Sequence, residues 1–447
     1  MRVRTTIIIT ASIVVIGAAA ARPLFQRPAI VAVDEQALRE YEGVYQWAPN
    51  AFMYLQRWRE LTPKVQLTAF DESGDVRTLY PTAAGRFFAG PGAAVPSSIE
   101  STIEFQRDGG RVVSLTWQTG GAPPRTAKRV DIEAHEDVAF SNGNVRLAGT
   151  LITPRTARTT RNPAIVLVHG SGAASREWMM PFARFLVRHG IAILGYDKRG
   201  VGQSTGDWKL ASFDDLAGDA LAAFEYLKTR PDIDGARIGL LGVSQAGWIM
   251  PIAAVREPGI AFLISVSGAG IPAAETSVDQ IRNELTANGT PKQNIDQFMN
   301  IMELQYRFAR TGEGWEDYAT TRAKLVARFG TAPDSFPETP DHPHWGFIRR
   351  LYFYDPGPTL RRLKTPTLGL FGELDNNIVA DKNKAAWEAA LGASGNRDYT
   401  LLILPKANHL QMEANIGSNA EMPSLRRFVP AYARSVTEWL AARVGPR

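Results

Sequence analysis

RIGLLGVSQAGW, residues 237–248, is the stretch of sequence that decides the fold. The apolar run before the serine is typical of a buried parallel strand, and the residues after it are typical of a helix. A serine on the turn between a strand and a helix is the setting of a nucleophile elbow, whose usual pattern is Gly-x-Ser-x-Gly. Gly242 and Ser244 fit this pattern, but Ala246 stands where the second glycine is usual. Because a methyl group is the smallest addition, the sequence still predicts Ser244 as a nucleophile, against the alternative of an ordinary strand end with a solvent-facing serine.

Apolar runs of the same kind recur along residues 130–447, and helical segments such as 176–190 and 214–230 lie between them. The runs cover residues 164–170, 191–197, 237–243, 261–268, 367–375 and 400–405. This alternation predicts an α/β fold with a doubly wound, mostly parallel sheet. Residues 271–358 interrupt the alternation, and much of that stretch has the periodicity of amphipathic helices. We expect it to form a helical cap at the carboxyl ends of the strands, where open α/β sheets bind ligands.

Residues 30–128 follow another pattern, in which short segments alternate apolar and polar residues around glycine-containing turns such as 72–74 and 108–110. This pattern predicts a small antiparallel β-barrel or sandwich. TGGAPPRTAKR, residues 119–129, has the composition of a linker. A hairpin through Asn142-Gly143 is expected to open the second domain, residues 130–447.

Residues 1–21 have the three parts of a secretory signal peptide. Arg2 and Arg4 give the charged start, an apolar stretch follows, and small residues form the cleavage region. An uncleaved anchor is the alternative, because the apolar run is close to the shortest that spans a bilayer. No later segment of the sequence is long and apolar enough to be predicted as a transmembrane helix. The expectation is an exported chain, periplasmic or secreted, without a stable membrane span after signal cleavage.

The composition excludes several classes of protein. The 447 residues include no cysteine, which rules out disulfides, thiol catalysis and cysteine-ligated zinc. The formal net charge is only +5, and the basic residues are interspersed with acidic ones, so nucleic acid is not an expected partner. The oligomeric state is not readable from the sequence.

Two further residues complete the expected chemistry of Ser244. A serine hydroxyl needs a base to remove its proton, and the base needs an acidic group to orient it. In a doubly wound hydrolase sheet the order along the chain is serine, acid, histidine. Asp375 follows the next-to-last strand and His409 follows the last, at the required places. Glu373 is the rival acid, but it lies closer to the strand, where the sheet dictates side-chain direction.

The negative oxygen of a tetrahedral intermediate also needs N–H donors in fixed positions. One is the backbone N–H of Gln245, the residue after the nucleophile. The second is expected from the loop in VLVHGSGAASREW, residues 166–178, at Ser171 or, alternatively, Gly172. His169 in the same loop is expected to be structural.

Five segments in chain order resemble the α/β-hydrolase superfamily, in particular its esterase and serine-aminopeptidase-like branches. They are VHGSG (168–172), GYDKRGVGQSTGDW (195–208), GVSQAG (242–247), FGELD (371–375) and ANHL (407–410). The resemblance implies Ser244 as nucleophile, His409 as base, Asp375 as its orienting acid, and the backbone N–H groups of Ser171 and Gln245 as the oxyanion hole. It also implies that residues 197–206 form a structural turn rather than a phosphate cradle.

Within the same resemblance, Asp197 and Arg199 pair locally on that turn. YEGVY, residues 41–45, is similar to small lipocalin-like domains appended to some secreted serine hydrolases.

The function expected on these grounds is hydrolysis of small-molecule carboxylic esters through an acyl-enzyme, without metal or cofactor. A serine aminopeptidase or an acyl thioesterase on the same triad is the alternative, and a non-catalytic binding protein is a remote one. An aminopeptidase would need a carboxylate to hold the substrate ammonium, and the cap offers Glu303, Glu313 and Glu316. His342 and His344 lie in a proline-rich stretch that is more typical of exposed surface than of a metal site.

Overall fold

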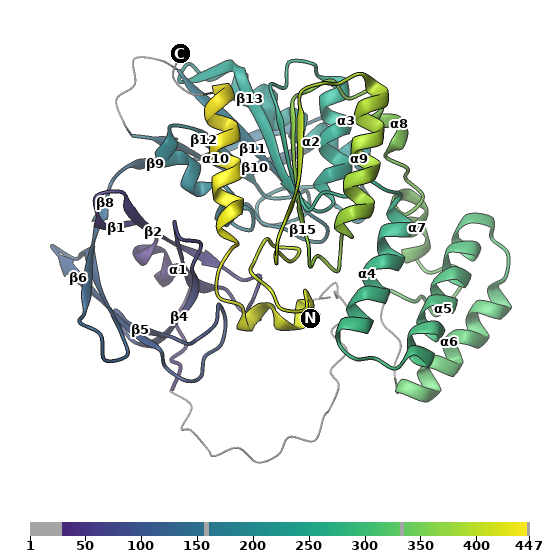
Figure 1. The fold of residues 1–447 in the computed structure, drawn as a ribbon, viewed down its shortest axis with the longest axis horizontal. Coiled ribbons are helices and arrows are strands. Elements are labelled where there is room, and N and C mark those ends of the chain that lie inside the picture. The colour runs from purple at the N-terminus through teal and green to yellow at the C-terminus, as the bar shows by residue number, and fades with distance from the viewer. Residues whose placement is uncertain (1–28, 156–160, 331–334, 445–447) are drawn as a thin grey trace.

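The computed structural model describes residues 29–155, 161–330 and 335–444. These residues form a closed antiparallel barrel, a mixed sheet flanked by helices, and a group of helices beside the sheet (Figure 1). The predicted α/β-hydrolase architecture with a preceding antiparallel β-domain is therefore confirmed. The expected signal peptide lies outside the described residues. Among the described residues, no helix combines the length and the apolar character that crossing a membrane requires.

The barrel closes because its first and last strands pair with each other. Its inward side chains form a separate aromatic and aliphatic core that includes Tyr45, Leu55 and Leu115. A short helix, α1 (Glu35–Leu38), and a 3₁₀ turn, η1 (Arg39–Tyr41), precede it. The strands are β1 (Gly43–Ala48), β2 (Ala51–Trp58), β3 (Gln66–Asp71), β4 (Val76–Ala83), β5 (Arg86–Ala89), β6 (Ser101–Asp108), β7 (Arg111–Thr119) and β8 (Arg125–Val130).

The prediction of a linker at residues 119–129 is wrong, because its second half is strand β8. This strand pairs with both β1 and β7 and completes the barrel. Its side chains are polar except for the inward Ala127, which is fully buried, and Val130 at its last position, which packs outside the barrel core. One small apolar residue leaves too little alternation for a strand to be recognised.

The second sheet has the order β16-β15-β14-β13-β11-β12-β10-β9, with parallel pairing from β12 to β16 and two antiparallel strands at one edge. The strands are β9 (Glu133–Asn142), β10 (Val145–Pro154), β11 (Asn162–Val168), β12 (Ala192–Tyr196), β13 (Ile233–Val243), β14 (Leu263–Val266), β15 (Thr367–Gly372) and β16 (Tyr399–Leu404). The helices on its two faces are α2 (Phe213–Lys228), α3 (Ala246–Arg256), α8 (Gly357–Leu360), α9 (Ala380–Ser394) and α10 (Pro430–Val444). The strands β11, β12, β13, β14, β15 and β16 overlap the apolar runs that the sequence marks as buried.

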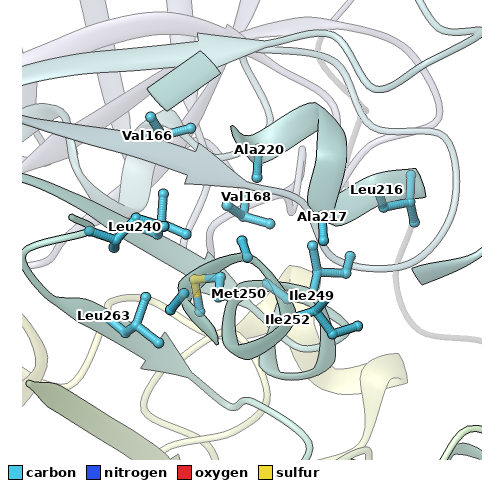
Figure 2. Packing of buried hydrophobic residues seen from close by; sticks show 14 of the residues in the cluster. Val166, Val168, Leu216, Ala217, Ala220, Leu240, Ile249, Met250, Ile252 and Leu263 are labelled. Carbon is cyan, nitrogen blue, oxygen red and sulfur yellow. The ribbon is translucent and has the colours of Figure 1, made fainter. Parts of the chain in front are cut away.

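Helix α3 is held against the sheet by an apolar layer shared with helix α2 (Figure 2). Val168, Leu240 and Met250 lie in this layer, and none of them is more than 1% exposed. Burial of this kind stabilises a fold by roughly 25 cal/mol per Å² of apolar surface. The layer fixes the start of α3, and with it the turn that carries Ser244.

The prediction of a helix at residues 176–190 is wrong in type. The segment forms two 3₁₀ stretches, η2 (Met180–Phe182) and η3 (Arg184–His189). Pro181 has no backbone N–H and its ring obstructs the preceding turn, so a continuous α-helix through it is disfavoured.

Four helices between β14 and β15 form the cap region beside the sheet (Figure 1). They are α4 (Ala273–Ala287), α5 (Lys292–Thr311), α6 (Trp315–Phe329) and α7 (His344–Leu351). They have their own core, in which Tyr318 and Trp345 are fully buried with their rings 5.2 Å apart.

The barrel and the hydrolase sheet share an extensive interface. Arg184 of η3 donates to the backbone oxygen of Leu55 at 3.1 Å and forms a buried ion pair with Glu133. The segment 423–429 also joins the two parts by backbone hydrogen bonds. Val76 donates to the oxygen of Arg426 at 2.9 Å on one side, and Glu413, beyond β16, donates to Arg427 at 2.8 Å on the other.

Candidate active site

Ser244 lies between the end of β13 and the start of α3, with a backbone φ of 60°. A positive φ is uncommon outside glycine and persists only where the surroundings enforce it. Such a turn directs the serine side chain away from the sheet, as a nucleophile elbow requires. The side chain is partly exposed and lines a large cleft.

Ala246 is tolerated at the second glycine position because Gly242 leaves room for it. A Cβ atom at Gly242 would lie 2.3 Å from the Cβ of Ala246 and 2.9 Å from the oxygen of Val168. The requirement for a small residue is therefore strict at Gly242 and also at Gly247, where a Cβ would lie 2.5 Å from the nitrogen of Ala269. The methyl group of Ala246 is fully buried beside Gly242.

Asp375 and His409 are brought into direct contact. The Nδ1 atom of His409 lies 2.9 and 3.0 Å from the two carboxylate oxygens of Asp375. The backbone N–H groups of Asn377 and Ile378 donate to the same carboxylate, each at 2.8 Å. These hydrogen bonds hold the Asp375 carboxylate in place, and the carboxylate in turn orients the ring of His409. The rival, Glu373, accepts a hydrogen bond from the backbone N–H of Lys406 instead.

Ser244 and His409 line the same cleft, which has a volume of about 3080 Å³. Its walls come from the barrel, the hydrolase sheet and the cap. The loop after β11 lies beside the serine, since a Cβ atom at Gly170 would be 3.6 Å from the Cβ of Ser244.

The expected oxyanion donors also lie at this place. Ser171 follows Gly170 in the loop beside the serine, and Gln245 follows Ser244 at the start of α3; both line the cleft. Within the described part of the chain, the backbone N–H groups of Ser171 and Gln245 have no hydrogen-bond partner. Donors without a protein partner are available to an oxygen atom of a bound ligand.

Lys198 connects the two segments that carry these donors, and sequence reasoning missed it. Its ammonium nitrogen donates to the backbone oxygen of Gly170 at 2.9 Å and to the side-chain oxygen of Gln245 at 3.0 Å. The side chain is buried, and this burial lowers the pKa of Lys198 to about 7, although the more distant charge of Asp219 acts in the opposite direction. A lysine within DKRG was a visible signal, but the resemblance assigned that segment to a structural turn.

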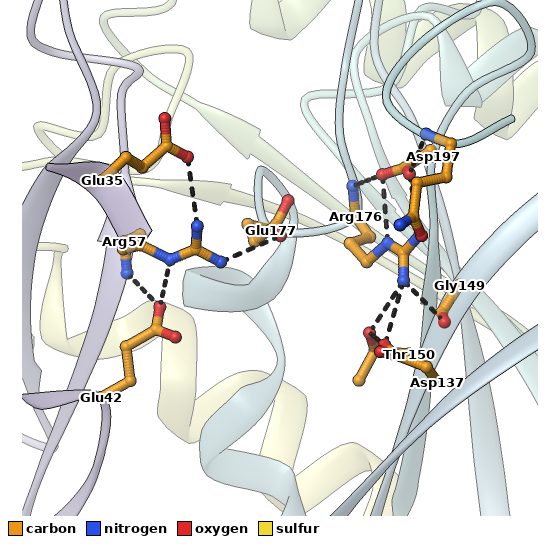
Figure 3. Close-up of polar contacts among 10 residues, drawn as sticks. Glu35, Glu42, Arg57, Asp137, Gly149, Thr150, Arg176, Glu177 and Asp197 are labelled. Carbon is orange, nitrogen blue, oxygen red and sulfur yellow. Dashed lines mark hydrogen bonds and ion pairs between the residues drawn. The ribbon is translucent and has the colours of Figure 1, made fainter. Parts of the chain in front are cut away.

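The local pairing expected of Asp197 and Arg199 is wrong. Arg199 pairs with Asp219 of α2, whereas Asp197 pairs with Arg176 (Figure 3). Both acids are almost fully buried, and each arginine approaches its carboxylate through two nitrogens. These two-nitrogen ion pairs join the loop after β12 to Arg176 and to helix α2, and do not link two residues within the loop.

His169 is buried, with its Nε2 atom 2.5 Å from the backbone oxygen of Tyr196. Burial lowers the pKa of His169 to about 3, and the nearby charge of Lys198 lowers it further. It is therefore a neutral histidine that supports the loop.

The cap carboxylates considered for an ammonium group lie elsewhere. Glu303, Glu313 and Glu316 are exposed, and none of them lines the cleft in the part of the chain that the structure describes. His342 and His344 do line it. Over the described ranges, no group of three or more histidine, aspartate or glutamate side chains is arranged to hold a metal ion.

Comparison with known proteins agrees with this architecture. The profile of the "Alpha/beta hydrolase family" matches residues 165–417. The chain belongs to this family. The hydrolase is 26% identical over 257 residues to Esterase EstD of Thermotoga maritima, which covers 56% of this chain and 55% of that protein. It is also 31% identical over 134 residues to the quorum-quenching protein AidA of Acinetobacter baumannii, which covers 30% of this chain and 43% of that protein.

The hydrolase therefore spans about half the length of these curated relatives. Among solved structures, an esterase of Pyrococcus furiosus aligns with a TM-score of 0.44 at 17% identity, covering 70% of this chain and 92% of that chain.

Proposed function

We propose that the protein is a serine hydrolase that cleaves small carboxylic esters through an acyl-enzyme on Ser244, His409 and Asp375. One observation carries the proposal: the histidine that contacts a buried carboxylate lines the same cleft as a serine held at positive φ. Membership of a hydrolase family and similarity to an esterase support the same chemistry.

In the proposed reaction, His409 removes the proton of the Ser244 hydroxyl while the serine oxygen attacks the acyl carbon. The Nδ1–H of His409 donates to Asp375, which holds the ring in the required tautomer. The N–H groups of Ser171 and Gln245 stabilise the negative oxygen of the tetrahedral intermediate.

His409 then donates its proton to the departing alcohol, and the C–O bond of the ester breaks. A water molecule, deprotonated by His409, attacks the acyl-enzyme and releases the carboxylic acid and free Ser244. His409 passes the proton taken from water to the Ser244 oxygen, which regenerates the free enzyme.

The test is labelling of the purified protein with a fluorophosphonate, because this reagent reacts with an activated serine. We expect the wild type and Ser73→Ala, which removes an exposed serine of the barrel, to label and Ser244→Ala to remain unlabelled. Turnover of p-nitrophenyl esters of increasing chain length should fall by about 10⁴-fold or more in Ser244→Ala and His409→Ala. A wild type that does not label would refute the proposal and leave a binding protein on a hydrolase scaffold.

The nature of the scissile bond is tested on the same preparation with aminoacyl anilides and acyl thioesters. Faster turnover of either class than of oxygen esters would replace the ester assignment while retaining the triad. We also propose that the chain is exported. Mass measurement of the N-terminus of the protein made in a bacterial host would test cleavage of residues 1–21.

A further inference from the structure

The barrel contributes a wall of the active-site cleft through the loop between β2 and β3. The indole nitrogen of Trp58 donates to the backbone oxygen of Trp178 at 3.2 Å, and the indole nitrogen of Trp178 donates to the carboxylate of Glu60. The ring of Trp178 lies 3.4 Å from the position of a Cβ at Gly170, beside Ser244. The side chain of Trp178 therefore lies between the Glu60 carboxylate and the loop residue Gly170 beside Ser244.

Glu60 differs from most of the acidic side chains of the cleft in having no cationic partner among the described residues. In the described part of the chain, eight acidic residues of the cleft form ion pairs with arginine. They are Glu35, Glu42, Asp131, Glu133, Asp137, Glu177, Asp197 and Glu338. Figure 3 shows the acids that gather on Arg57 and Arg176; they are Glu35, Glu42, Glu177, Asp137 and Asp197.

Three acidic residues of the cleft remain. Glu284 of α4 accepts hydrogen bonds from Asn288, from the Ser418 hydroxyl and from the backbone of Asn419. Asp207 caps a local turn by accepting from the backbone N–H of Lys209. Glu60 has the single side-chain donor Trp178, and no lysine, arginine or histidine nitrogen among the described residues lies within ion-pair distance of its carboxylate.

The surroundings of Glu60 favour the arrival of a positive charge. The Glu60 side chain is exposed to the solvent of the cleft. The protein atoms around its carboxyl raise the pKa of Glu60, whereas the hydrogen bond from Trp178 and the charges of a protonated His409 and of Arg59 act in the opposite direction. A carboxylate on a cleft wall that no neighbouring cation neutralises attracts a positive charge that enters the cleft. Glu60 and His409 line the same cleft.

We propose that Glu60 is a specificity-determining residue of this hydrolase, and that its carboxylate binds the ammonium group of acyl substrates whose carbonyl lies at Ser244. The simplest substrates of this class are esters of α-amino acids. The inference rests on the proposed serine-hydrolase function and deepens it: the barrel supplies the charge that selects the substrate. The aminopeptidase carboxylate expected in the cap is thus supplied by the N-terminal domain.

The test compares kcat/KM for three p-nitrophenyl esters of similar size: the alanine ester, which is cationic, the propionate ester, which is neutral, and the glutarate half-ester, which is anionic. In the wild type we expect the order cationic, neutral, anionic. Glu60→Gln keeps an acceptor for Trp178 but removes the charge, so the ratio of alanine to propionate ester should fall about 10- to 100-fold.

Glu60→Lys should reverse the order and favour the glutarate half-ester. Glu35→Gln is the matched control, because it removes a carboxylate of the same barrel that is already paired with Arg57; its ratio should equal that of the wild type.

A different result would identify a purely structural role. If Glu60 only positions Trp178, Glu60→Gln and Trp178→Phe change turnover of all three esters by the same factor, and the ratio does not move. That outcome, or a wild-type preference for the anionic ester, overturns the inference. Fluorophosphonate labelling separates this failure from failure of the proposed function: a wild type that labels while its ratio is insensitive to Glu60 refutes the inference about Glu60 alone.

Discussion

Replacement of Lys198 by methionine should make the stability of the hydrolase less dependent on pH. Burial lowers the pKa of Lys198 from 10.5 to about 7 in the folded state. Between these two values the unfolded chain binds a proton that the native chain does not, so the free energy of unfolding of the wild type rises with pH. Below pH 7 both states are protonated and the contribution is constant at its most destabilising value. Between pH 6 and pH 9 the expected gain is about 3 kcal/mol for this one group.

The measurement is urea-induced unfolding of the wild type and Lys198→Met at pH 6 and pH 9. All other titrating groups are common to both proteins, so the change in their stability difference isolates Lys198. Methionine retains the length of the side chain but no donor, and it leaves the oxygens of Gly170 and Gln245 without their partner. Lys209→Met, an exposed lysine eleven positions along the same loop region, controls for the loss of a lysine as such. A stability difference equal at both pH values would refute the assignment of a buried, readily deprotonated amine.

Three further predictions concern the elbow and the domain interface. Gly242→Ala should lower the free energy of unfolding in urea by about 1–3 kcal/mol and abolish fluorophosphonate labelling. The double variant Gly242→Ala/Ala246→Gly should recover part of that stability. An unchanged free energy of unfolding in Gly242→Ala would contradict the close contact between Gly242 and Ala246. Arg184→Met should lower the free energy of unfolding by about 3–5 kcal/mol at pH 7, because it leaves the buried carboxylate of Glu133 without its cationic partner. Burial raises the pKa of Glu133, but the charge of Arg184 dominates and brings the pKa to about 2. The stabilisation of the fold by this ion pair is therefore complete above pH 4.5 and should disappear in an acid titration as the pH falls toward 2. Deletion of residues 30–128 should abolish soluble expression. An unchanged soluble yield and an unchanged kcat/KM would show that the barrel contributes neither to folding nor to catalysis.

Much of the hydrolase sheet was predictable because its parallel strands are buried on both faces and appear as continuous apolar runs. The position of Asp375 and His409 followed from the same strands, since residues just beyond the carboxyl ends of parallel strands gather at one edge of the sheet. Strand β8 was missed because its only inward apolar side chain is Ala127. The 3₁₀ segments were missed because apolar spacing does not distinguish them from a helix interrupted by Pro181.

The contributions of Lys198 and Glu60 were not predictable for a different reason. Glu60 and Trp178 are 118 residues apart in the chain, and no local periodicity reports that they meet. Lys198 is unusual only once its burial and its acceptors are known. An isolated charged residue in a sequence is normally solvated, so its burial is information that the fold adds.

The backbone hydrogen bonds between the barrel and segment 423–429 have a consequence for the order of folding. Arg77, in an early strand, donates to the oxygen of Arg426, 349 residues later, and the same late segment supports the loop that carries His409. Contacts of such long sequence separation form late, because the intervening chain must first be confined. During synthesis the barrel can close by itself, but the part of its docking surface that pairs with residues 423–429 has no partner until the last part of the chain has left the ribosome. The catalytic apparatus is therefore expected to be among the last parts to mature, and a nascent chain truncated before residue 423 should carry a barrel and most of a sheet but no working histidine.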